Sequence, residues 1–344
     1  MFDKLLSWLR EKARLWFGED TPISVSVSAP MESAITLWAQ MYDTGGPWCH
    51  GGKDPLHSLG LPQSIAAELA RLTTLEMECL VSGSARADSI NELLKSFIAD
   101  LRIPVEYGCA LGGVLFRPYL DPAGHIQIDV VQGDCFFPTA FDTSGRLVGA
   151  VFSEQIKRRG TIYTRLERHE FTAGTEVIRN KAFASSTTAA LGSEIPLTDV
   201  SEWADIAPEV TLTDLQRPLF AYFRIPLANR NDRHSPLGAS VYGLAAGNIR
   251  DADEQYGRLL WEYEGGQLAV DVDAAALRPT ENGGQQMDQR GKRLYRGGIT
   301  GNVGDRPLFN VFAPALRDES YLRGLDSALK RIEFQCCLLY TSPS

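Results

Sequence analysis

The stretch "NIRDADEQYGRLLWEYEGGQLAVDV", residues 248–272, joins a charged amphipathic helix to a short strand. Apolar residues recur every three or four positions from Val241 to Tyr263, and this spacing predicts a helix over 240–264. At about 1.5 Å per residue the helix is roughly 38 Å long, which is more than a compact domain usually needs. We expect Gly265 and Gly266 to end it, because glycine favours helix C-termini, and "LAVDV" then alternates as a strand does.

The polar residues of this helix are predicted to face away from the core, where they are available to other proteins. They are Arg250, Asp251, Asp253, Glu254, Arg258 and Glu262.

A second long helix is predicted to begin near Arg317 or Asp318 and to run through "SYLRGLDSALKRIEFQC". Residues 277–304 are rich in Gly, Asn and Gln, which is typical of loops. Two long helices therefore bracket a β and loop excursion of about 50 residues, like a stalk with a knob at its tip. The excursion contains a cluster of basic residues. The simplest interpretation is that these residues lie in turns and increase solubility; the alternative is that they contact nucleic acid or a motor protein. The cluster consists of Arg290, Lys292, Arg293 and Arg296.

Upstream of the helix, residues 107–155 alternate β-type runs with the turn sequences "DPAGH", "QGD" and "DTSG", which predicts antiparallel hairpins. A further strand pair is expected across "RGTIYTRLERHEF" and "TEVIRNKAF". Residues 61–100 read as two helices joined near "SGSAR", with Ser89 and Glu92 at capping-box spacing. The acidic stretch from Glu194 to Asp214 has six carboxylates and no Lys or Arg, which favours a solvated irregular connector. The apolar "PLFAYFRIPLAN" is expected to return to the core.

The amino-acid composition argues against several classes of function. The net charge of -9 argues against a protein that holds nucleic acid by general charge neutralisation. Six cysteines without CxxC spacing favour a reducing compartment, and no apolar run approaches the roughly 20 residues of a transmembrane helix. Residues 2–17 form an amphipathic helix that we expect to dock on protein, with a membrane surface as the alternative.

Motifs for catalysis are scarce. The chain lacks a GxxxxGK[ST] loop, a GxSxG elbow and an HExxH pair. His125, His169 and His234 are isolated in the sequence and are expected to be structural or exposed. Asp271 and Asp273 match the metal-binding DxD of some sugar transferases, but alternation puts both on one strand face, which favours solvated side chains. A metal-dependent nucleotide- or sugar-handling α+β enzyme that uses these aspartates is the alternative hypothesis.

Three segments, in this order, carry a resemblance to a known family: "VEYGCALGGVLFRPYLDPAGHIQIDVVQGDCFFP", "SPLGASVYGLAAGNIRDADEQYGRLLWEYEGG" and "LFNVFAPALRDESYLRGLDSALKRIEFQC". They resemble segments of phage portal proteins of the Gp6-like or A118-like group. The resemblance covers the chain to about residue 337 and depends on several weak motifs in order, without a catalytic signature.

The resemblance implies an α+β portal fold with a helical and antiparallel-sheet wing, long stem helices and a small α/β clip. Residues 1–235 would form the wing, 236–266 the first stem helix, 267–312 the clip and 313–337 the start of the returning stem helix. The crown is missing, and we expect residues 338–344 to be a non-native tail. Arg290, Lys292, Arg293 and Arg296 would face DNA or terminase in the clip. The stem contacts between subunits would come from Arg250, Asp251, Asp253, Glu254, Arg258, Glu262, Arg317, Arg323, Lys330 and Arg331.

The family implies a homo-oligomeric ring, usually of twelve subunits, at one capsid vertex of the virion. Double-stranded DNA passes through its channel during packaging and ejection. Its partners would be terminase, the head-completion or adaptor proteins, and scaffold or capsid proteins, with assembly in the host cytoplasm. The resemblance implies no enzyme activity, no cofactor, no metal and no membrane.

Overall fold

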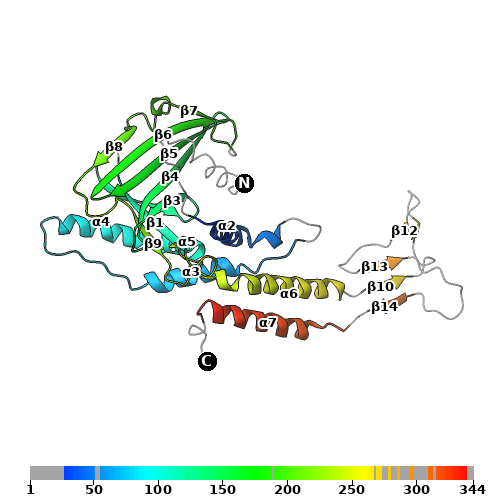
Figure 1. The fold of residues 1–344 in the computed structure, drawn as a ribbon. Helices are drawn as coiled ribbons and strands as arrows, with labels where there is room; N and C mark the ends of the chain where they lie inside the picture. Colours follow the sequence, from blue (N-terminus) through cyan, green and yellow to red (C-terminus); the bar gives the residue numbers. More distant parts are fainter. Residues whose placement is uncertain are drawn as a thin grey trace. The chain divides into compact units, whose positions relative to one another are not determined.

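The protein combines α-helices with mainly antiparallel sheets, so the expected α+β class is confirmed. The computed structural model describes residues 27–50, 55–121, 123–187, 190–266 and 315–338, and the backbone of the strand segments 269–272, 278–279, 285–286, 294–297 and 309–312. The chain divides into two compact units, one of residues 1–50 and 60–246 and one of residues 51–59 and 247–344 (Figure 1). The expected N-terminal helix over 2–17 lies outside the described residues.

The helices of the first unit come early in the chain. They are α2 (Ala29–Thr44), α3 (Leu61–Thr74), α4 (Ala87–Asp100) and α5 (Arg102–Leu111), with a short 3-10 turn η1 (Pro47–Cys49). Local chemistry sets the ends of α2, because the Ser28 hydroxyl accepts a hydrogen bond from the Met31 amide and Gly45 ends the helix at φ 84. The two helices expected over 61–100 are confirmed. The capping box is wrong: α4 begins at Ala87, so Ser89 already lies inside the helix.

Helices α2, α3 and α5 bury a common set of side chains, including Trp38, Ile65 and Cys109. Tyr242, which is fully buried, donates a hydrogen bond to the Trp38 carbonyl at 2.9 Å. The turn from α5 into the first strand requires glycine at position 112. Its φ is 88, and a Cβ there would lie 2.6 Å from the carbonyl oxygen of Gly238.

Two sheets follow the helices (Figure 1). The three-stranded sheet has the order β2-β1-β9 and is antiparallel; its strands are β1 (Gly113–Leu120), β2 (Ile126–Gln132) and β9 (Ala221–Arg224). The six-stranded sheet has the order β3-β4-β5-β6-β7, with β8 also paired to β6. Its strands are β3 (Phe136–Phe141), β4 (Leu147–Arg158), β5 (Thr161–Thr172), β6 (Thr175–Ser185), β7 (Ser193–Ile195) and β8 (Glu209–Leu212).

Two of the three predicted turns join hairpins. The Asp121 carboxylate accepts hydrogen bonds from the amides of Ala123 and His125 between β1 and β2, and Asp142 serves the β3–β4 turn in the same way. The hairpin predicted at "QGD" is wrong, since β2 and β3 belong to different sheets and the chain crosses from one sheet to the other at Gly133. The strand pair predicted after residue 158 is confirmed as β5 and β6.

The acidic connector is only partly solvated, which corrects the expectation. It includes β7, a 3-10 turn η2 (Leu197–Asp199) and β8, and it buries Leu197, Val200 and Trp203 against Ala182 of β6. Basic residues on the neighbouring strands neutralise several of its carboxylates. The pairs are Glu194 with Lys181, Glu202 with Arg158, and Glu209 with Arg179. The return to the core at 218–229 is confirmed by the buried Phe220 and Ile225.

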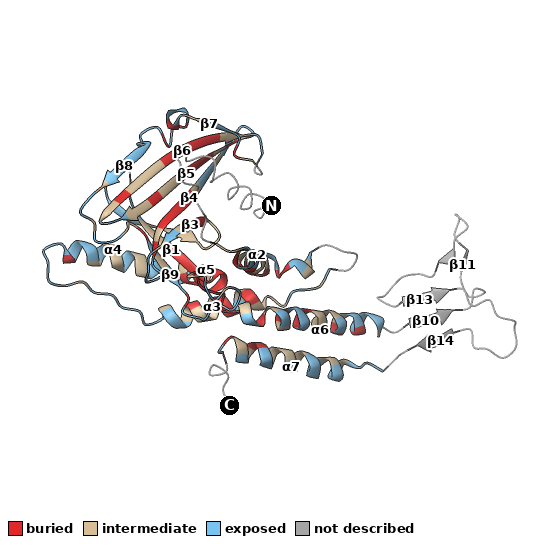
Figure 2. Ribbon diagram, in the orientation of Figure 1, coloured by how far each residue is buried: buried red, intermediate tan, exposed pale blue. Residues whose placement is uncertain are grey.

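Helix α6 (Ala246–Gly265) begins six residues later than the predicted 240, after a 3-10 turn η3 (Gly243–Ala245). The delay follows from the segment before it, where the Val241 amide bonds to the Cys109 carbonyl rather than to a helical partner. The second unit continues with short strands and with α7 (Asp318–Gln335), whose start agrees with the prediction. The described parts of α6 and α7 are more exposed than the strands β4 to β6 (Figure 2).

The short strands of the second unit form a mixed sheet and a separate pair. The mixed sheet has the order β13-β10-β14, with β10 parallel to β13 and antiparallel to β14, and β11 pairs with β12. The bounds are β10 (Ala269–Val272), β11 (Arg278–Pro279), β12 (Gln285–Gln286), β13 (Leu294–Gly297) and β14 (Phe309–Phe312). Strand β10 thus completes its sheet within its own chain, directly after the Gly265–Gly266 break.

Candidate functional site

The second unit carries most of the predicted contact residues, on helices α6 and α7. On α6, Glu254 lies between two arginines of its own helix, 3.3 Å from Arg250 and 3.7 Å from Arg258. These are i,i+4 pairs on an exposed surface, and each is worth about 0.3–0.5 kcal/mol. Asp251 is exposed and forms no ion pair with any described residue. Its predicted contact with another subunit stays a prediction, as do those of its neighbours.

Asp253 does not face away from the core, which corrects the expectation. It is fully buried, and its carboxylate accepts a hydrogen bond of 2.8 Å from the Leu59 amide. The reason is that residues 55–59 pack against α6; the side chain of Leu56 lies 3.7 Å from where a Cβ of Gly257 would be. A buried carboxylate needs such a donor, because an unsatisfied charge in the interior is costly.

Glu262 is the second correction on this helix, because it is 7% exposed rather than solvated. Its carboxylate accepts three hydrogen bonds from Arg317: from the backbone amide at 3.0 Å, from Nε at 3.2 Å and from Nη2 at 2.8 Å. The hydrogen bonds and the positive charge of Arg317 hold the pKa of Glu262 below its usual value. The guanidinium of Arg317 also lies over the ring of Tyr321, 5.7 Å from its centroid. This clasp joins the end of α6 to the start of α7.

The other ends of the two helices also meet. The Asn248 amide donates to the Gln335 side chain at 2.7 Å. Because Asn248 begins α6 and Gln335 ends α7, the two contacts define an antiparallel helix pair. Next to this contact is an open groove of about 630 Å³, lined by Asn248, Asp326, Ser327, Lys330, Arg331, Phe334 and Gln335.

The predicted basic residues of α7 are exposed. Lys330 pairs with Asp326 at 2.8 Å and Arg323 with Glu319 at 4.0 Å, both along the helix. Arg331 is exposed and forms no ion pair with any described residue. Large apolar side chains lie on the same helices: Trp261 is 64% exposed and Phe334 70%, and Tyr263 and Leu322 are also exposed. Aromatic side chains are enriched at protein interfaces, so Trp261 and Phe334 are candidate contact residues.

Two of the remaining predicted residues, Asp271 and Arg296, lie on strands of the small sheet. Asp271 lies on β10, opposite Arg296 on β13 and Asn310 on β14. The other candidates, Asp273, Arg290, Lys292 and Arg293, lie outside the described residues. Within the described ranges, no three His, Cys, Asp or Glu side chains gather in a way that could hold a metal ion.

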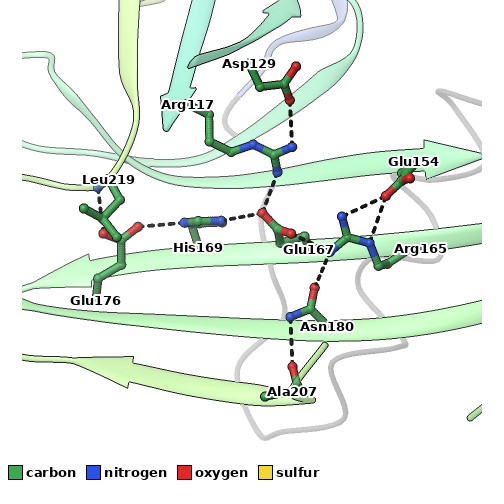
Figure 3. A network of polar contacts seen from close by, with 10 residues as sticks. All are labelled: Arg117, Asp129, Glu154, Arg165, Glu167, His169, Glu176, Asn180, Ala207 and Leu219. Atoms are coloured by element: carbon green, nitrogen blue, oxygen red, sulfur yellow. Dashed lines mark hydrogen bonds and ion pairs between the residues drawn. The ribbon is translucent and has the colours of Figure 1, made fainter. Parts of the chain in front are cut away.

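The first unit contains a chain of buried charges that the sequence reading missed (Figure 3). His169 on β5 lies between two carboxylates, with Nδ1 2.7 Å from Glu176 and Nε2 2.8 Å from Glu167. Glu167 also accepts hydrogen bonds from Arg117 of β1 and Arg165 of β5. Arg117 in turn donates to Asp129 of β2 at 2.8 Å, so the chain connects the two sheets.

Both imidazole nitrogens of His169 face carboxylate oxygens, so both must donate, and the ring is held as the imidazolium. Burial alone would lower the pKa of His169, but the hydrogen bonds and charges of Glu167 and Glu176 outweigh it and raise the pKa. Burial similarly opposes ionisation of Glu167, yet His169, Arg117 and Arg165 lower its pKa to about 2. The network is therefore a set of matched charges.

A sequence signal for this network exists in "RLERHE". Arg165, Glu167 and His169 alternate along β5 and therefore share one face of the sheet. The pattern alone also fits a solvated face. What buries it, namely β1 and the Phe220 segment, comes from 50 residues before and after it. His169 is structural, which is one of the two outcomes expected from its isolation in the sequence.

No known protein-family profile matches the chain, and a search of curated proteins gives no significant match. None of the described helices is long and apolar enough to cross a lipid bilayer.

Proposed function

We propose that this chain is a subunit of a phage portal, the ring at one capsid vertex through which DNA is packaged and ejected. The observation that carries the proposal is the second unit: an antiparallel pair of amphipathic helices, joined by contacts at both ends, with a small sheet inserted between them. In portal terms, α6 and α7 are the stem helices and β10 to β14 belong to the clip. The ordered resemblance of three sequence segments supports the same assignment.

The surface of the helix pair supports a ring. Several charged groups on α6 and α7 pair along their own helix, while others, including Asp251 and Arg331, have no ion-pair partner among the described residues. Trp261 and Phe334 leave apolar area in water. A neighbouring copy that packs against these helices would cover that area and supply opposite charges, and rotational symmetry would repeat each contact around a closed ring.

The charge balance of the chain supports contact with DNA that stays mobile. A net charge of -9 repels phosphates and prevents tight adhesion. The cationic cluster at 290–296 would then be the local contact for DNA or for the terminase motor, which the family places at the clip. Terminase and head-completion proteins are the partners that this proposal implies.

Light scattering after size exclusion, combined with negative-stain electron microscopy, tests the proposal. We expect a species near twelve times the 37.9 kDa subunit, visible as rings with a central hole. A cooperative thermal transition must first show that the chain is folded. A folded protein that remains a monomer at high concentration, and that shows no rings, would contradict the proposal.

A further inference from the structure

The first unit contains a cavity of about 790 Å³ that the proposed ring does not use. It lies where β1 and β9 meet the β3–β4 turn and the segment that leads into β9. Its walls combine apolar and cationic side chains. The lining residues include Phe116, Arg117, Arg146, Arg217, Tyr222 and Arg224.

The charged side chains that line this cavity are all basic. Four of the described lining residues are arginines and none is acidic. Arg217 is exposed and forms no ion pair with any described residue. Arg146 is exposed beside Asp142 of the same turn, whose pKa its charge helps to lower. Arg224 donates one hydrogen bond to the Pro236 carbonyl at 3.2 Å. Asp129 and Glu167 already balance the charge of Arg117. The exposed guanidinium groups of Arg146, Arg217 and Arg224 are the ones that favour an anionic ligand.

Arg117 is the least exposed of the four arginines, with 17% of its side chain exposed. Asp129 and Glu167 fix its two terminal nitrogens, and its Nε is buried without a hydrogen-bond partner. Its guanidinium also lies 4.7 Å from the ring centroid of Phe152. Its position is therefore set before any ligand arrives.

The wall that faces Arg117 is equally rigid. The Leu219 amide donates to the buried Glu176 at 2.7 Å (Figure 3). The Phe220 ring lies 5.7 Å from that of His169. The charge network beneath thus holds both sides of the cavity. Aromatic and aliphatic groups, including Phe116, Leu147 and Tyr222, provide apolar surface between the arginines. A prebuilt site of this kind avoids the ordering costs that weaken flexible sites.

We infer that this cavity binds an acidic segment of a partner protein, whose carboxylates meet Arg146, Arg217 and Arg224 while an apolar side chain packs between them. Arginine recognises carboxylates well because its planar fork makes two parallel hydrogen bonds. Double-stranded DNA fits less well, since it is a stiff convex rod that cannot reach the apolar floor of a concave site. A free inorganic anion would leave that floor uncovered.

Fluorescence anisotropy with synthetic decapeptides tests the inference on the full chain. The probe alternates pairs of Asp or Glu with Phe or Leu; one control peptide replaces every carboxylate by its amide, and another replaces every apolar residue by Ser. We expect the probe to bind and both controls to lose at least about tenfold in affinity. The paired variant Arg146→Gln/Arg217→Gln should weaken probe binding by about tenfold or more, because two charge-assisted contacts are lost.

The matched control variant is Arg86→Gln/Arg102→Gln, which removes the same charge from exposed positions that do not line the cavity. We expect it to bind the probe as the unmodified chain does, and both variants to keep the original unfolding temperature. Equal binding losses in the two variants would mean that only the overall charge matters, and would overturn the inference. So would absence of probe binding, or binding of a 20-base-pair duplex or of inorganic phosphate in place of the peptide with the same dependence on Arg146 and Arg217.

Discussion

At the scale of single residues, His169 is the residue on which the charge network depends. The ring is nearly inaccessible, and each of its nitrogens has a carboxylate partner. Removing it would leave Glu167 and Glu176 facing each other without the cation between them. An intact buried ion pair adds little to the stability of a fold, but a buried charge that loses its partner destabilises the fold strongly. The network therefore favours the arrangement of the two sheets in which every charge keeps its partner.

The network predicts how stability depends on pH. The pKa of His169 is raised in the folded protein above 6.5, so its contribution is complete below pH 6.5 and is lost as the pH rises through the folded value. The pKa of Glu167 falls from 4.5 to about 2, so its contribution is complete above pH 4.5 and is lost as the pH falls towards 2. The network should therefore stabilise the first unit most between about pH 4.5 and 6.5.

Thermal unfolding across the pH range checks this, with His169→Gln compared to the original chain. We expect His169→Gln to cost about 3 kcal/mol near pH 6 and less at alkaline pH, where the native imidazole also loses its charge. His234→Gln is the matched control, because His234 is exposed. A cost for His169→Gln that is the same at pH 6 and pH 9 would show that the imidazolium charge does not stabilise the fold.

At the scale of helices and strands, the sequence correctly predicted those elements that are determined by residues close together in the chain. The start of α7, the β5–β6 pair and the turns at Asp121 and Asp142 follow from periodicity and turn chemistry within a few residues. The errors at Asp253 and at "QGD" have a different origin. The deciding partner of Asp253 is Leu59, 194 positions away. At "QGD", β2 pairs with β1, whose other neighbour is the remote β9, while β3 pairs with β4 in the other sheet.

The acidic connector shows the same limit. Its carboxylates suggest solvent, yet Trp203 is 1% exposed in a cluster with Leu197 and Val200. The basic residues that neutralise the connector lie on β4 and β6, so their positions are not evident from the connector itself. Charge composition describes the surface of such a segment and leaves its buried side undetermined.

We therefore predict that Trp203→Ala destabilises the first unit by about 4 kcal/mol, because it empties a large site in a packed cluster. Trp261→Ala is the matched control, since Trp261 is largely exposed on α6. It should change the free energy of unfolding of the unassembled chain by less than about 0.5 kcal/mol. Chemical denaturation followed by circular dichroism measures both. Equal effects of the two changes would contradict the burial of the connector.

The clasp between α6 and α7 gives a prediction for the second unit. Arg317→Ala should loosen the first turn of α7, because Glu262 loses both side-chain hydrogen bonds that Arg317 provides. We expect faster hydrogen exchange at residues 318–322 and little change in the first unit. Arg323→Ala is the control, since its contact with Glu319 is long and exposed. If the two changes accelerate exchange equally, the clasp does not order α7.

At the scale of the whole molecule, the two units differ in how their charges are used. In the first unit, carboxylates and guanidinium groups meet between elements and are partly or fully buried, as along Arg117, Glu167 and His169. In the second unit, most pairs run along one helix and are exposed, and among its described charged residues only Asp253 and Glu262 are buried. A unit with little core of its own, and with large apolar groups in water, is expected to gain stability from partners.

This contrast leads to a prediction about assembly. The pair Trp261→Ser/Phe334→Ser should shift the protein from rings to smaller species, because it removes exposed apolar area that a neighbouring copy would cover. Leu120→Ser in β1 removes a comparably exposed group, 68% accessible, from the first unit and serves as the control. Sedimentation velocity at several protein concentrations measures the outcome. Rings that persist in the double variant, at the concentrations where the original chain forms them, would place the subunit contacts elsewhere than on the aromatic groups of α6 and α7.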